Sequence, residues 1–94
     1  MASAQESAEI VALQALAWLA GNDALMPAFV EASGVDINEI RSRATDPAFL
    51  IAVLDFILTE DAWVIGFCDA NGLPYAALDQ ARQNLPGGAR LHWT

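Results

Sequence analysis

The sequence contains no lysine, and its 94 residues carry four arginines against twelve aspartate and glutamate residues. The formal net charge of −8 repels phosphate groups over long distances, which argues against binding to nucleic acid or to an anionic membrane. The longest uncharged run, residues 10–22, has 13 positions, whereas a helix that crosses a bilayer needs about 20. The N-terminus also lacks the basic and apolar segments of a signal peptide. We therefore expect a cytoplasmic protein without membrane contact.

Cysteine and histidine occur once each, as Cys68 and His92. A single cysteine excludes a disulfide within the chain and suits a reducing compartment. A zinc site needs several nitrogen or sulfur ligands at fixed spacing, and only these two residues could supply them. Glycine-rich phosphate loops and Ser/His/Asp sets are absent too, and one imidazole leaves most hydrolytic mechanisms without a base. The sequence therefore predicts no catalytic residue, no cofactor and no metal site.

Apolar residues make up 55% of the chain, more than the roughly 45–50% of an ordinary soluble domain. A domain of this length buries about two-thirds of the surface that its unfolded chain exposes. Its interior therefore has too little room for all the apolar side chains. We expect a homodimer, or a partner protein, to cover the remainder.

Apolar positions recur at helical spacing, and no alternation typical of a β-strand is long enough to form one. We predict a single all-α domain over residues 7–88, a compact bundle of five to six short helices between a flexible N-terminus (1–6) and a C-terminal tail (89–94). Because proline is unfavourable inside a helix, we expect a turn before Pro27 and regular helix from about that residue onward. The predicted helices cover residues 7–20, 23–33, 36–45, 47–58, 60–71 and 74–85.

Local signals mark several helix ends. Asp36, Asp46 and Thr59 stand where each can cap the helix that follows it. Gly34 can end the second helix in a left-handed conformation. Tyr75 is expected on the buried stripe of the last helix. The first helix is apolar on all sides, which predicts a central position or partial cover by another chain.

Residues 10–46 and 48–84 align without a gap when the chain is shifted by 38 positions, and six of the 37 aligned positions are identical. The shift places Phe29 on Phe67, and the matches concentrate on core positions and helix ends. This pattern predicts two copies of a three-helix unit related by a pseudo-twofold axis, with the two phenylalanines in equivalent places. Two unrelated helical hairpins that each end at glycine would give part of the same pattern.

Several short segments are distinctive when taken together: Trp18-Leu19-Ala20, Asp46-Pro47-Ala48-Phe49-Leu50, Val53-Leu54-Asp55-Phe56, Phe67-Cys68, Gly72-Leu73-Pro74, Ala81-Arg82 and Leu85-Pro86-Gly87-Gly88. Over about residues 12–88 the chain resembles the family of short bacterial proteins called domain of unknown function 3572. The resemblance implies a small cytoplasmic helical protein. It supplies no functional residues, because none are defined for the family. Pro27 departs from the family pattern at the start of the second helix.

Three side chains are candidates for chemistry. Cys68 lies late in a helix beside Asp69, a neighbour that raises a thiol pKa, so we expect a packed core residue. Asp55 is the only charge in the fourth helix and shares a stripe with small residues, which favours a solvated face over a catalytic acid. His92 is expected to be solvent-exposed in the tail.

The function expected by elimination is that of a small non-catalytic module that binds another protein or forms a homodimer. Its candidate interface consists of apolar side chains that the core has little room for: Val11, Trp18, Trp63, Leu91 and Trp93. Ordinary core packing is the alternative interpretation, most of all for the tryptophan of the first helix.

Two other classes of function stay open. A helical domain of this size can form a pocket in which carboxylates bind a small ligand or catalyse a reaction. Residues 29–44 can also be compared with a helix-turn-helix, with Arg41 and Arg43 on its second helix. Asp36 and Glu39 would then lie at the end of that helix that meets the bases, and together with the net charge they disfavour this alternative.

Overall fold

The computed structural model describes residues 3–87, and within that range the chain forms six α-helices, one 3-10 helix and no strand. The predicted all-α bundle is thereby confirmed. The elements in chain order are α1 (Ala4–Ala20), α2 (Leu25–Ser33), η1 (Ile37–Glu39), α3 (Ile40–Arg43), α4 (Pro47–Leu58), α5 (Asp61–Asn71) and α6 (Ala77–Asn84).

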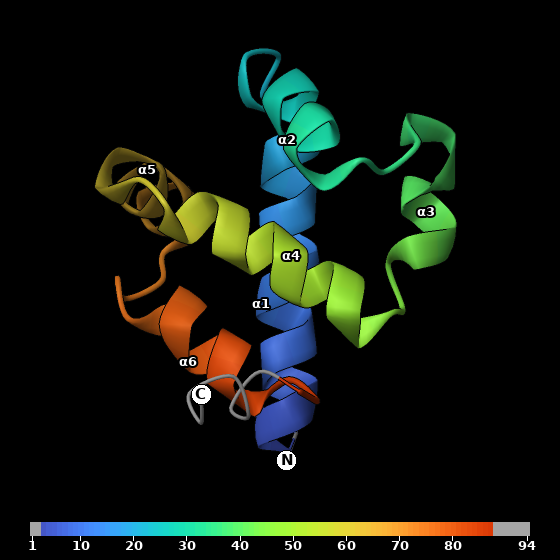
Figure 1. Ribbon diagram of the computed structural model, residues 1–94. Coiled ribbons are helices and arrows are strands. Elements are labelled where there is room, and N and C mark those ends of the chain that lie inside the picture. Colours follow the sequence, from blue (N-terminus) through green and yellow to red (C-terminus); the bar gives the residue numbers. More distant parts are fainter. Residues whose placement is uncertain (1–2, 88–94) are drawn as a thin grey trace.

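The longest helix, α1, lies at the centre of the bundle. It contacts α2, α4, α5 and α6, and α4 crosses in front of it in Figure 1. The side that α1 buries combines small and large apolar residues: Ala8, Ala12, Ala15, Leu16 and Leu19. The three alanines leave room for neighbouring helices to approach the α1 backbone. This is the central position expected for a helix that is apolar on all sides.

The start of α1 lies three residues earlier than predicted, at Ala4. Ser3 Oγ accepts a hydrogen bond from the Glu6 amide at 3.1 Å, and Glu6 Oε1 accepts one from the Ser3 amide at 3.4 Å. This reciprocal pair is a capping box, which the Ser-x-x-Glu spacing could have indicated. Residues 4–6 are therefore helical, although the sequence analysis assigned them to a flexible N-terminus.

The proline in the second helix lies in its first turn, because α2 begins at Leu25, two residues before Pro27. An amide in that turn has no acceptor within the helix, so proline costs no hydrogen bond there. The Asn22 side chain accepts hydrogen bonds from the Ala24 and Leu25 amides, both at 3.0 Å, and so stabilises the turn that leads into α2. The expected turn before Pro27 is thus present. Gly34 ends α2 with a φ of 73°, a conformation that favours glycine.

The helix predicted over residues 36–45 is replaced by η1 and the four-residue α3. Asp36 caps η1 as expected, since its carboxylate accepts a hydrogen bond from the Asn38 amide at 2.9 Å. α3 ends at Arg43, and a turn at residues 44–45 connects it to the residue before Pro47, a position that favours extended backbone. Asp46, which precedes Pro47, has a ψ of 116° and caps α4 through the Ala48 amide at 3.0 Å.

Two expected side-chain roles in the later helices are wrong. Thr59 does not cap α5, because its hydroxyl donates a hydrogen bond back to the Phe56 carbonyl of α4 at 2.6 Å. The residue that precedes α5 is Glu60. Tyr75 lies before the start of α6 and is 55% exposed, with its hydroxyl donating to Asp69 at 2.9 Å. Its polar end therefore finds a partner at the surface, which it would lack in the core.

Three edge-to-face aromatic contacts join the two halves of the chain, and two of them correspond to each other. The rings of Trp18 in α1 and Phe67 in α5 have centroids 6.0 Å apart, at an interplanar angle of 73°. Phe56 in α4 contacts Phe29 in α2 at 5.4 Å and 70°. Each second helix thus packs against the first helix of the other half: α5 lies against α1, and α2 against α4.

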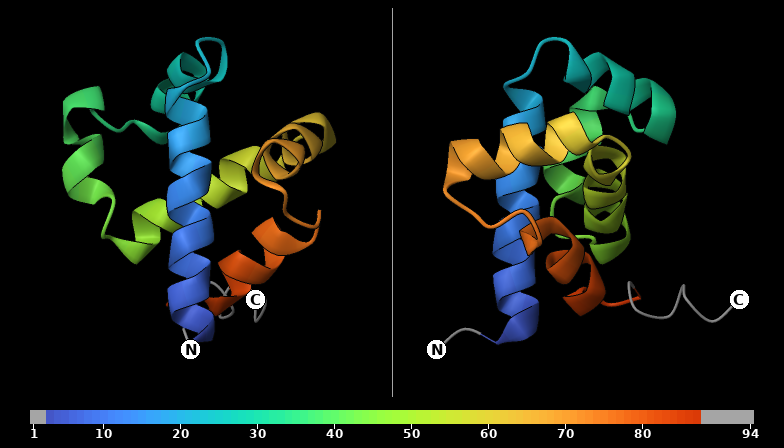
Figure 2. Two further views of the ribbon diagram at one scale, coloured as in Figure 1. Left: turned by 180° about the vertical axis from the view of Figure 1, so that it is seen from behind. Right: turned by 90° about the vertical axis from the view of Figure 1, so that its left-hand side faces the viewer.

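These two contacts correspond to each other under the 38-residue shift, which places Trp18 on Phe56 and Phe29 on Phe67. The third helices of the two halves differ, however. α6 packs against α1 and α4, whereas α3 has its main contacts with η1 on the opposite side of the bundle (Figures 1 and 2). The 38-residue repeat stays a prediction, which the corresponding aromatic pairs support.

Replacing Phe29 by alanine should lower the free energy of unfolding by about 3–5 kcal/mol. The ring is 1% exposed and contacts two phenylalanines of α4, Phe49 and Phe56. The matched control is Ile10→Ala, which removes a side chain that is 54% exposed and should change stability by less than about 0.5 kcal/mol. Urea denaturation followed by circular dichroism measures both values. Equal losses in the two variants would contradict this assignment of the core.

Candidate interaction surface

The one cysteine of the chain is a core residue, as the sequence predicts. Cys68 has no exposed surface and packs within the apolar cluster between the helices. Burial, followed by the neighbouring charge of Asp69, raises the pKa of its thiol. The reactive form of a cysteine is the thiolate, and both effects disfavour that form. Cys68 therefore contributes packing to the fold.

Asp55 forms an ion pair that the sequence analysis did not foresee. Arg82 Nε of α6 donates to Asp55 Oδ1, and Arg82 Nη2 lies 3.4 Å from Asp55 Oδ2. The Arg82 side chain is only 15% exposed, against 46% for Asp55. The hydrogen bond that Arg82 donates to Asp55 raises the pKa of Arg82, so the guanidinium stays charged. Asp55 thus has a structural role, since the pair connects α4 to α6.

Metal ligands and membrane spans can be assessed for the described residues. No group of three or more histidine, cysteine, aspartate or glutamate residues within positions 3–87 could hold a metal ion. In the same range no helix is both long enough and apolar enough to cross a membrane. His92 and two of the candidate interface residues, Leu91 and Trp93, lie outside the described residues.

The other three candidate interface residues, Val11, Trp18 and Trp63, are partly buried and pack against the core. Trp63 stacks on Phe56 with ring centroids 5.0 Å apart. Trp18 lies close to α5, where a Cβ atom added at Gly66 would be 3.4 Å from its ring. Each tryptophan therefore already has a partner inside the fold, as the core-packing interpretation expects.

The large apolar side chains that the fold leaves exposed are different ones: Ile10, Leu13, Ile37, Ile65 and Tyr75. Ile37 is the most exposed of them, at 60%. It lies in η1, within the segment for which the sequence predicted a longer helix. Since this segment forms only a short turn, the isoleucine stays at the surface.

Ile37 lies at the edge of an open groove with a volume of about 720 Å³. A second hollow of about 510 Å³ continues the groove along η1 and α3, and the two share Ala20, Met26 and Ile37. We call the combined surface the α2–η1 groove. The larger hollow is lined by Ala20, Asp23, Met26, Pro27, Val30, Glu31, Val35, Asp36 and Ile37.

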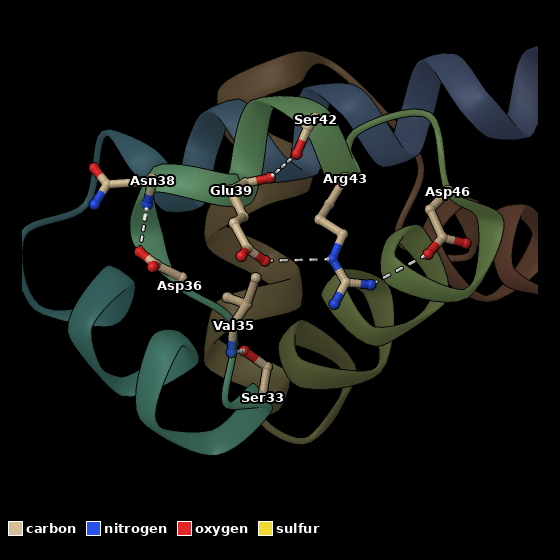
Figure 3. Close-up of polar contacts among 8 residues, drawn as sticks. All are labelled: Ser33, Val35, Asp36, Asn38, Glu39, Ser42, Arg43 and Asp46. Atoms are coloured by element: carbon tan, nitrogen blue, oxygen red, sulfur yellow. Dashed lines mark hydrogen bonds and ion pairs between the residues drawn. The ribbon is translucent and has the colours of Figure 1, made fainter.

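One wall of the α2–η1 groove is the segment from Val35 to Arg41. Short-range contacts within this segment and just beyond it hold it in place (Figure 3). The Ser33 hydroxyl accepts a hydrogen bond from the Val35 amide at 3.2 Å. Arg43 forms two ion pairs: its Nε lies 4.0 Å from Glu39 Oε2, and its Nη1 lies 3.4 Å from Asp46 Oδ2. Both ion pairs of Arg43 are exposed, so each adds little stability. Val35, which is 8% exposed, anchors this wall to the core.

Alkylation of Cys68 should be negligible in the folded protein at neutral pH and fast in denaturant, because burial removes access and raises the thiol pKa. Iodoacetamide labelling followed by mass spectrometry at increasing urea concentrations measures this, with a free-cysteine peptide as the control. The onset of labelling should coincide with unfolding. Rapid labelling without urea would show that the thiol is accessible in the native state.

The family comparison agrees with the extent of the helical bundle. The family model described as Protein of unknown function (DUF3572) matches residues 5–88, a range that includes almost all of α1 and every later helix. No curated protein and no solved structure matches the chain. Because the family model matches most of its length, the chain belongs to the family of proteins of unknown function called DUF3572.

Proposed function

We propose that this protein is a non-catalytic helical module that binds another protein through the α2–η1 groove. The observation that carries the proposal is the exposure of Ile37, 60% accessible at the edge of a groove with an apolar floor. Ile37 is not isolated, because Met26, Val30 and Val35 line the same groove, and contiguous apolar surface bordered by polar residues is typical of protein-binding sites. Met26 adds an adaptable side chain to the floor, as in other grooves that bind helices.

The proposal also accounts for the apolar excess in the sequence. The bundle already buries a continuous core, yet the groove retains Met26, Val30 and Ile37 along its open surface. A partner segment laid into the groove would remove these side chains from water. The unpaired thiol of Cys68 suits the reducing cytoplasm, in which we place the module.

The alternatives have less support. A small ligand is normally enclosed over most of its surface, whereas this groove lies open along α2 and η1. A homodimer through the groove would bring together two chains of net charge −8. For a helix-turn-helix, the second helix would be α3, which has four residues and follows directly after Glu39. One turn of helix with a carboxylate at its start is poorly suited to the major groove of DNA.

Photocrosslinking tests the proposal. Benzoylphenylalanine at position 37 should form a crosslink to one partner protein in cells, whereas the same group at position 65, exposed on α5, should not. The partner, once identified and purified, should bind the wild-type protein directly. Ile37→Asp should weaken that binding at least about tenfold, because it places a charge against apolar partner surface.

Positions 37 and 65 also supply the control variant and the results that would contradict the proposal. Ile65→Asp introduces the same charge at a comparably exposed site and should leave the affinity unchanged. Identical crosslinks at positions 37 and 65 would contradict the proposal. So would a purified partner that binds Ile37→Asp as tightly as the wild-type protein.

A further inference from the structure

Three carboxylates line the α2–η1 groove together with its apolar side chains. Asp23, Glu31 and Asp36 line its larger hollow, and Arg41 lines the far end of the smaller one. Neither Asp23 nor Glu31 forms an ion pair within residues 3–87. The chain has few cations to offer, since it contains no lysine and Arg43 is engaged outside the groove. The negative charge at the groove is therefore available to a partner.

In the second half of the chain, the carboxylate that aligns with Glu31 has a hydrogen-bond donor within the fold. The 38-residue shift places Glu31 on Asp69 and Ile37 on Tyr75. Tyr75 donates a hydrogen bond to Asp69 at 2.9 Å, and this bond raises the pKa of the tyrosine hydroxyl. Ile37 has no donor to offer Glu31. A hydrogen-bond donor for Glu31 can instead come from a molecule that covers Ile37.

The floor of the groove suits the apolar face of a helix. Met26 and Val30 are four residues apart in α2, so both project from the same face of that helix. Ile37 of η1 lines the same groove, and Ala20 at the end of α1 lines both of its hollows. A helix laid in such a groove anchors itself with side chains at positions i, i+3 or i+4, and i+7.

From this combination we propose that the partner presents a basic amphipathic helix, whose apolar stripe covers Met26, Val30 and Ile37 and whose lysines or arginines face Asp23 and Glu31. The inference rests on the proposed function and specifies the chemistry of the partner. A second copy of this chain does not meet the requirement. Its longest helix, α1, contains no basic residue, and the whole chain has only four arginines.

The test uses two synthetic peptides of about 15 residues, long enough to form a helix on binding. One has leucines at i, i+3 or i+4 and i+7 and lysines elsewhere, and its twin carries glutamate in place of each lysine. Fluorescence anisotropy of the labelled peptides measures their affinity at about 0.15 M ionic strength, where distant charges are screened. The lysine peptide should bind, Ile37→Asp should abolish that binding, and the glutamate twin should not bind.

Two double variants that each remove two negative charges distinguish an effect of the groove carboxylates on peptide binding from an effect of the net charge. Asp23→Asn with Glu31→Gln should lower the affinity for the lysine peptide about tenfold. Glu60→Gln with Asp61→Asn removes the same charge from exposed positions at the start of α5 and should change the affinity less than about twofold. All four side chains are exposed, and thermal melts should show both double variants folded.

Three results would overturn the inference. Equal weakening by both double variants would show that only the net charge attracts the peptide. Equal binding of the glutamate twin, abolished by Ile37→Asp, would leave the groove as a protein-binding site but reject a basic partner. Absence of binding by the lysine peptide would reject the basic helix, while the proposed function would still be decided by crosslinking at position 37.

Discussion

The structure depends on the packing of each short aromatic helix against the long apolar helix of the other half of the chain. Phe67 of α5 contacts Trp18 of α1, and Phe29 of α2 contacts Phe56 of α4. Both phenylalanines are almost completely buried. Because α2 and α5 also pack against the first helix of their own half, each of these phenylalanine-bearing helices lies between helices of both halves. The remaining side of the α1–α4 pair is covered by α6, which the Arg82 guanidinium connects to α4.

This arrangement leaves one segment at the margin of the core, where Ile40 of α3 is only partly buried. α6 covers α1 and α4, so η1 and α3 have no corresponding place and lie on the opposite side of the bundle (Figures 1 and 2). Their separation from α1 and α2 produces the α2–η1 groove. Apolar side chains on the floor and carboxylates at the edge then give the groove two properties. It can bury apolar surface of a partner, and it repels acidic molecules, including copies of this chain.

The sequence predicts most of the helices because their end signals are local. Asp46 and Pro47 define the start of α4, and Gly72 ends α5 in a left-handed conformation. The groove was not predicted, because it results from how distant segments pack and from the early end of the third helix. The Asp55–Arg82 pair was missed for a similar reason, as its partners are 27 residues apart and no local spacing connects them. The apolar content of the sequence likewise indicated more apolar side chains than the core can hold. It did not show that Ile37 would be one of those left exposed.

Packing of α1 against α4 should stabilise the fold most, whereas the η1–α3 wall of the groove is held by short-range contacts and should open more easily. Native-state hydrogen exchange at increasing denaturant concentrations measures the free energy of opening in each region. Buried amides of α1 and α4 should exchange only through global unfolding. Amides of residues 37–44 should exchange with a lower free energy that depends little on denaturant. Equal free energies of exchange in the two regions would show that the wall unfolds together with the core, contrary to this expectation.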